Sequence, residues 1–135
     1  MRFRRPNTAR LQRMQGEVQS RQALAGDTEG MNVASSIIAD ENEGRRNLLA
    51  NTFEREGYDV TRLGTLTQTE ATAGAVLPDV LLLEGEWSEG SAMDVCQNLS
   101  SQPRFRSATR MLILSRTTAP DFLSAAALAG VAEVI

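Results

Sequence analysis

The sequence predicts an α/β protein with a doubly wound, five-stranded parallel sheet. Short apolar runs bounded by polar residues recur at 36–39, 79–84 and 111–114, and such runs are typical of strands buried on both faces of a parallel sheet. Helix-like stretches separate these runs, and strict alternation of strand and helix favours a parallel sheet with helices on both faces. Right-handed crossovers then limit the topology to a doubly wound sheet.

The predicted elements follow one another from residue 36 onward. Leu48, Leu49 and Phe53 lie on one face of the first helix, and Gly57 is its stop. Residues 58–63 alternate between apolar and polar side chains, as an edge strand does. The expected strands are 36–39, 58–63, 79–84, 111–114 and one that begins at 131, and the expected helices are 43–56, 67–76, 92–99 and 121–129.

A basic N-terminal extension precedes the predicted domain. Residues 1–30 hold six arginines and three acidic residues, and the net charge of the whole chain is −3, so residues 31–135 carry −6. Weak helical periodicity over 8–25 is followed by a glycine-containing linker at 26–30. We therefore divide the chain into a basic extension, 1–30, and a domain, 31–135. Because this domain is acidic, we do not expect it to bind the phosphates of a nucleic acid.

Two residue types are missing, and their absence excludes several kinds of chemistry. The 135-residue chain has no histidine, and all 14 of its basic residues are arginines. A Ser-His-Asp triad, a histidine-ligated zinc site, a P-loop lysine and a Schiff-base lysine are therefore excluded. No apolar stretch is long enough to span a membrane, and no secretory signal is recognisable. A cytoplasmic protein without a membrane partner is the expectation.

Acidic residues follow the predicted strands on the edge where open α/β sheets place their chemistry. Asp40 and Glu41 come directly after the first strand, Glu84 ends the third, and Ser115 ends the fourth. Hard cations prefer oxygen ligands of this kind, so the three carboxylates predict a candidate Mg²⁺ pocket. The Ser115 hydroxyl beside it would suit contact with a phosphoryl oxygen.

These segments resemble the CheY-like receiver domain of bacterial two-component response regulators, whose sheet is flavodoxin-like. The resemblance covers residues 35–135. Four pieces of the chain match in order and spacing, with Arg46 at the place expected in the helix after the first piece. The matching segments are Ile37–Glu41, Pro78–Glu84, Met111–Ser115 and Ala129–Ile135.

The resemblance implies roles for these residues, and the chain departs from several of them. In the family, the acidic pair holds magnesium, an aspartate ending the third strand accepts a phosphoryl group, a Ser or Thr contacts the phosphate, and a lysine follows the fifth strand. Here Glu84 stands at the phosphoacceptor position, and its extra methylene moves the carboxylate by roughly 1.5 Å, enough to cost about 10²-fold in rate. The chain has no lysine and stops before the family's fifth helix. We therefore do not expect the normal phosphoryl-transfer cycle.

An atypical receiver is the function that we predict: a non-enzymatic signalling and protein-interaction module, independent of phosphorylation. Its partner would be a signalling protein or its own output domain, bound at the face around the fourth strand, the fourth helix and the fifth strand.

The missing fifth helix has three explanations: a longer parent protein, a homodimer, or cover by residues 8–25. Glu84 facing Ser115 could also mimic a phosphorylated aspartate. Trp87 is either a lid over the crevice or a partner contact. The alternative is a Mg²⁺-dependent ligand-binding or enzymatic domain that uses the acidic crevice.

Overall fold

The computed structural model describes residues 33–117 and 119–135, which include the whole predicted sheet. The predictions for residues 1–30, including the helix over 8–25 and the linker, lie outside the described residues. The boundary between an extension and a domain at residue 31 therefore stays a prediction.

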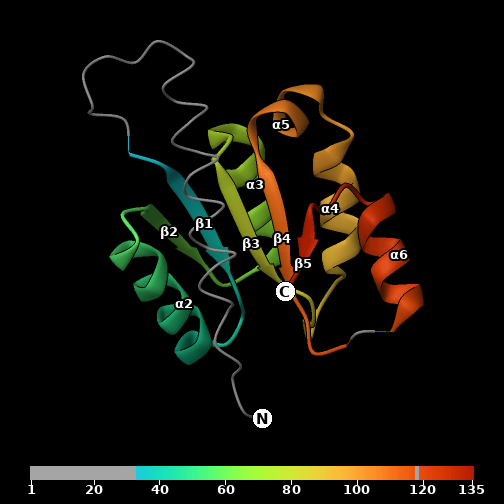
Figure 1. The fold of residues 1–135 in the computed structure, drawn as a ribbon, viewed down its shortest axis with the longest axis horizontal. Coiled ribbons are helices and arrows are strands. Elements are labelled where there is room, and N and C mark those ends of the chain that lie inside the picture. Colours follow the sequence, from blue (N-terminus) through green and yellow to red (C-terminus); the bar gives the residue numbers. More distant parts are fainter. Residues whose placement is uncertain (1–32, 118) are drawn as a thin grey trace.

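A five-stranded, all-parallel sheet forms the centre of the molecule, and this confirms the predicted fold class (Figure 1). The strand order is β2-β1-β3-β4-β5, so the chain starts near the middle, adds β2 on one side and then builds outward on the other. All five residues of β3 are buried, as the continuous apolar run predicts. The strands are β1 (Ser35–Ala39), β2 (Asp59–Leu63), β3 (Val80–Glu84), β4 (Arg110–Leu114) and β5 (Glu133–Val134).

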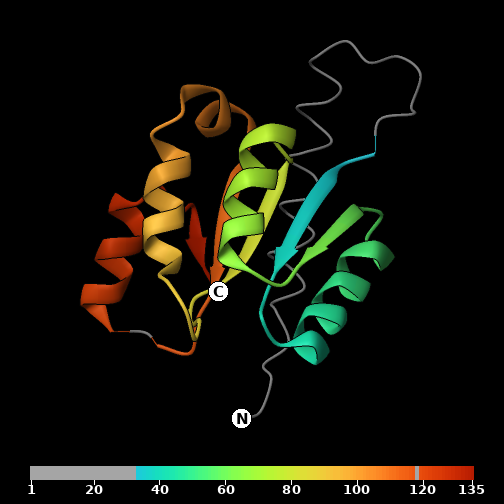
Figure 2. The same ribbon diagram turned by 180° about the vertical axis from the view of Figure 1, so that it is seen from behind.

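Helices cover both faces of the sheet (Figures 1 and 2). Among the described residues, α2 packs on one face, where its buried residues meet the side chains of Ile38, Leu82 and Leu112. The other four helices share the opposite face. The helices are α2 (Glu43–Arg55), α3 (Leu66–Val76), α4 (Ala92–Ser100), α5 (Pro103–Ala108) and α6 (Pro120–Leu128).

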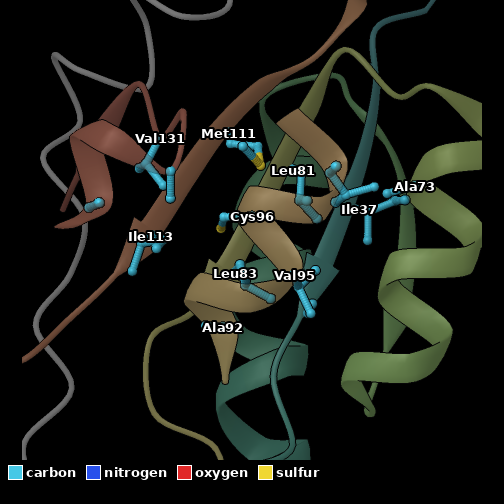
Figure 3. Packing of buried hydrophobic residues seen from close by; sticks show 14 of the residues in the cluster. Ile37, Ala73, Leu81, Leu83, Ala92, Val95, Cys96, Met111, Ile113 and Val131 are labelled. Carbon is cyan, nitrogen blue, oxygen red and sulfur yellow. The ribbon is translucent and has the colours of Figure 1, made fainter. Parts of the chain in front are cut away.

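Alternate residues of each strand feed two hydrophobic clusters, because successive side chains of a strand point to opposite faces. In Figure 3, Leu81 and Leu83 of β3 lie with Val95 and Cys96 of α4 in the larger cluster. Leu82 points the other way, into the cluster beneath α2. The strands whose carboxyl ends carry the acidic residues are therefore packed on both faces.

Three local predictions were wrong. A short helix, α5, lies between α4 and β4 where no helix was expected, so the described residues contain five helices. Leu48 is 44% exposed and does not share the buried face of Leu49 and Phe53. Tyr58 precedes β2 and packs its ring on Phe53, with ring centroids 5.0 Å apart.

No helix in the described part of the chain is long and apolar enough to cross a membrane.

Candidate functional site

Asp40, directly after β1, is completely buried and is held by three hydrogen bonds. The backbone N–H of Asn42 donates to its Oδ1 at 2.9 Å. Arg45 donates from Nε to Oδ2 at 2.8 Å and from Nη2 to Oδ1 at 2.9 Å. This two-pronged pairing of guanidinium and carboxylate is the strong and directional form of an ion pair.

The start of α2 places Arg45 against Asp40. Asn42 caps the helix, and its side-chain oxygen accepts a hydrogen bond from the Arg45 backbone N–H at 2.9 Å. The next residue, Arg46, donates from Nη1 to the Asp40 backbone carbonyl at 2.8 Å and so fixes the backbone of the same turn. One turn of capped helix therefore supplies both arginines to the end of β1.

Glu84, the last residue of β3, also lies close to the Arg45 guanidinium. Its Oε2 is 3.6 Å from Arg45 Nε, and its Oε1 accepts a hydrogen bond from the Glu86 backbone N–H at 3.3 Å. Only 3% of Glu84 is exposed. Desolvation is the largest influence and raises the pKa of Glu84. The charge of Asp40 adds to the rise, while the Glu86 N–H, Arg45 and Arg116 oppose it.

The guanidinium of Arg45 shows the matching perturbation. Its pKa is raised above the ordinary value, chiefly by the hydrogen bond to Asp40 and further by the charges of Asp40, Glu84 and Glu41. Burial opposes this rise. Asp40, Arg45 and Glu84 therefore form one electrostatic unit, which we call the Arg45 clamp.

Glu41 turns away from this unit and fastens the β3–α4 loop. Its Oε1 accepts from the Ser88 backbone N–H at 2.7 Å, and its Oε2 accepts from the Ser88 hydroxyl at 2.6 Å. In the same loop, the indole N–H of Trp87 donates to the Glu84 backbone carbonyl. The half-buried Trp87 also packs against the larger hydrophobic cluster. Both roles expected for Trp87, a lid over the crevice and a partner contact, stay predictions.

Ser115, the predicted switch hydroxyl, is engaged in a local turn. Its Oγ accepts from the Thr117 backbone N–H at 3.1 Å, and its own N–H donates to the Ile135 carbonyl at 3.1 Å. The neighbouring Arg116 pairs with Glu86 on the surface, with Nη1 and Oε2 3.4 Å apart. In the part of the chain that the structure describes, Glu84 is therefore paired with Arg45 and Ser115 with Thr117.

Two of the three predicted carboxylates, Asp40 and Glu84, lie near Arg45. The third, Glu41, binds Ser88 instead. Among the described residues, no group of three cysteine or acidic side chains is arranged to hold a metal ion. The residue that sequence reasoning missed is Arg45. Its signal was available, because three acids at one sheet edge without a lysine need a cation, and Arg45 follows Asp40 by five residues, in the first turn of the helix.

A pocket of about 240 Å³ lies between the β2–α3 and β3–α4 loops. Glu41, Trp87 and Ser88 line it, so it shares residues with the fastened loop. Residues 64–67, at the start of α3, also line it.

No protein-family profile and no curated protein sequence matches the chain. Solved structures do match, among them the following three. The chemotaxis response regulator CheY4 of Vibrio cholerae shares 16% identity and a TM-score of 0.70, over 76% of this chain and 85% of that one. A protein of Burkholderia thailandensis described as a pilus assembly protein shares 24% identity and a TM-score of 0.63, over 76% and 84%. A response regulator of Burkholderia pseudomallei, solved with a phosphorylated aspartic acid and calcium, shares 20% and 0.67, over 75% and 58%.

The fold is therefore that of the CheY-like receiver domains, as the residue motifs indicated. At these identities the likeness concerns the fold.

Proposed function

We propose that this chain is a receiver-like signalling module that works through contact with a protein partner and without phosphorylation of a strand-end carboxylate. The burial of Glu84 is the observation that carries the proposal. At 3% exposure, with one oxygen bound to the Glu86 N–H and the other facing Arg45, it offers a phosphodonor little room for attack.

The surroundings of Glu84 support the same conclusion. The β3–α4 loop is fastened at Trp87 and Ser88, so the approach along the strand end is covered. Phosphoryl transfer relies on cations that neutralise developing charge, and here the neighbouring Arg45 is already committed to Asp40. The one thiol, Cys96, is buried with its pKa raised to about 12, so it is a poor nucleophile. We therefore include a non-enzymatic role in the proposal.

The surface around α6 is the candidate partner face. Leu128 is 88% exposed and Leu123 is 40% exposed, although α6 is fixed to the core through the small residues Ala126 and Ala129. Exposed leucines on a helix next to the edge strand β5 would supply apolar contacts to a signalling partner, to an output domain or to a second copy of the chain.

A small phosphodonor tests the independence from phosphorylation. We expect intact-mass spectrometry of the wild type with acetyl phosphate and Mg²⁺ to show no added phosphoryl group. The E84D variant is the matched control, because it restores the shorter side chain while leaving the loop residues in place. Stoichiometric phosphorylation of the wild-type protein, or partner affinity that changes with the phosphodonor, would contradict the proposal.

A second candidate function follows from two of the structural relatives. Proteins described as pilus-assembly-related from Burkholderia pseudomallei and B. thailandensis share 23% and 24% identity with this chain, more than CheY4 at 16%. The module would then regulate the assembly of a surface pilus. Deleting the coding gene should reduce the number of pili seen by electron microscopy, and reintroducing the gene should restore them. Unchanged piliation would remove this candidate.

A further inference from the structure

The acidic crevice does not fit the divalent cation that receiver folds imply. Mg²⁺ needs oxygen ligands at about 2.0–2.1 Å in near-octahedral order. Both carboxylate oxygens of Asp40 already accept hydrogen bonds from Arg45, at 2.8 and 2.9 Å, and Oδ1 also accepts from Asn42. Both carboxylate oxygens of Glu41 accept hydrogen bonds from Ser88, one from its backbone N–H and one from its hydroxyl.

A cation already lies between the two buried carboxylates. Arg45 Nε is 2.8 Å from Asp40 Oδ2 and 3.6 Å from Glu84 Oε2, so one guanidinium faces both strand ends. Its side chain is 18% exposed, while those of Asp40 and Glu84 are 0% and 2% exposed. A divalent ion placed between these carboxylates would also meet the positive charge of Arg45 at close range.

We propose that Arg45 is the resident cation of this crevice, a tethered guanidinium that replaces a divalent metal ion and makes the folded domain indifferent to Mg²⁺. The inference deepens the proposed function and rests on it, because a receiver that needs no phosphoryl transfer needs no metal for that step. The planar fork of an arginine suits the role, since it can grip one carboxylate with two N–H groups while it faces another.

The proposal predicts the effect of removing the Arg45 guanidinium. Without Arg45, the two buried carboxylates lose their cation, and either a proton or a divalent ion must reduce their repulsion. A metal site absent from the wild type should therefore appear in R45M, a variant that keeps much of the side-chain length and removes the charge. R46M is the matched control, because Arg46 binds the backbone carbonyl of Asp40 and not the two carboxylates.

The experiment measures Mn²⁺ binding by the paramagnetic relaxation of water protons, together with thermal unfolding. We expect R45M to bind Mn²⁺ at least about tenfold more tightly than the wild type and R46M, since a tenfold change is a modest free energy for one ion pair. Because a ligand that binds only the folded state raises the unfolding temperature, Mn²⁺ should stabilise R45M and leave the other two unchanged.

Two results would overturn the inference. One is tight saturable Mn²⁺ binding by the wild type, with a dissociation constant well below about 1 mM. This measurement needs no variant and decides the matter if R45M does not fold. The other is a folded R45M that binds Mn²⁺ no better than R46M. The phosphodonor experiment on the wild type is independent, so wild-type Mn²⁺ binding without phosphorylation would overturn this inference and leave the proposed function standing.

Discussion

At the scale of single residues, the arrangement around Arg45 is asymmetric in burial. Asp40 and Glu84 are almost completely shielded from water, whereas the arginine reaches them from the first turn of α2 and keeps part of its surface exposed. Buried ion pairs contribute little over an apolar replacement, but removing one partner leaves an uncompensated buried charge. The stability of the domain should therefore depend strongly on this one cation.

Replacing Arg45 by alanine should lower the free energy of unfolding by about 3 kcal/mol at neutral pH, because two buried carboxylates lose their cation. Urea unfolding followed by circular dichroism measures this difference. The control is R62A, since the pair between Arg62 and Glu54 is exposed and should be worth less than about 1 kcal/mol. Equal losses in the two variants would contradict the special role of Arg45.

The raised pKa of Glu84 gives stability a predictable dependence on pH. The folded protein holds this proton more tightly than the unfolded chain does, so the contribution of Glu84 favours folding at low pH. That contribution falls as pH rises from the unfolded value, near 4.5, through the raised folded value. E84Q cannot titrate, so its stability relative to the wild type should increase across this window. A constant difference in urea unfolding at each pH would show that the linkage is absent.

At the scale of elements, two contacts hold the β3–α4 loop. Trp87 donates a hydrogen bond to the Glu84 carbonyl, and Glu41 accepts hydrogen bonds from Ser88. The two attachments join the ends of β1 and β3 to one loop, so the loop reports on both strand ends. Trp87 is the one tryptophan of the sequence, and its fluorescence is therefore a direct probe of this loop.

Cutting the Glu41 attachment should loosen the loop without unfolding the domain. In E41A, two charge-assisted hydrogen bonds to Ser88 are lost, and we expect a stability decrease on the order of 1 kcal/mol at this exposed position. Trp87 should become more accessible to acrylamide quenching. E89A removes an equal charge from the same loop and is the control. If both variants quench alike, the Glu41 contact does not hold the loop.

Gly130, just after the C-cap of α6, has a conformation that a side chain would strain. Its φ is +87°, and an added Cβ would clash with Ser100 Oγ, an atom that donates a hydrogen bond to the Ala129 carbonyl at 2.7 Å. G130A should therefore cost about 2 kcal/mol or more in urea unfolding. G44A, in the exposed first turn of α2 where the nearest atom would be 3.4 Å away, should be neutral or slightly stabilising. A neutral G130A would contradict this account.

The sequence was most informative where burial alone decides the structure. The run Val80–Glu84 is buried at every position, so its pattern sufficed to place the central strand. The missed helix α5 has six residues and one buried side chain, Phe105, too short a stretch for periodicity to register. Leu48 matched the helical spacing but fell just outside the arc that faces the sheet. Such boundaries depend on how the helix is rotated, which a local pattern does not specify.

The site was harder to predict, because side-chain direction depends on tertiary contacts. Strand order placed Asp40 and Glu84 at one edge, and they do share Arg45. Glu41 follows Asp40 in the chain but points to Ser88, a residue 47 positions away. No spacing rule reveals that choice. The family resemblance drew attention to Arg46, whereas the neighbouring Arg45 makes the carboxylate contacts.

At the scale of the whole molecule, the packed interior around the sheet contrasts with a surface on which single apolar residues are exposed. Leu83 of the central strand is 1% exposed, and Leu128 of α6 is 88% exposed. The two leucines therefore test different properties of the same protein: the integrity of the core and the binding of a partner.

L83A should lower the free energy of unfolding by about 3 kcal/mol, because it opens a cavity between β3 and α4. L128A should change stability by less than about 0.5 kcal/mol and should weaken partner binding. Urea unfolding and a pull-down from cell extract measure the two effects. If L128A binds the partner as well as the wild type does, the partner face does not include Leu128 of α6.

The sheet order also has a consequence for synthesis of the chain. β1 emerges early, yet it lies between β2 and β3, and Ser36 pairs with Val80, which is translated 44 residues later. At about 5–20 residues per second, roughly 2–9 s pass before that partner strand exists. During this interval one backbone edge of β1 has no partner strand, and Ile37 and Ile38 lack the side chains of β3 that pack beside them. A nascent chain of this protein should therefore be an early client for a ribosome-bound chaperone, and the demand should end once β3 has left the exit tunnel.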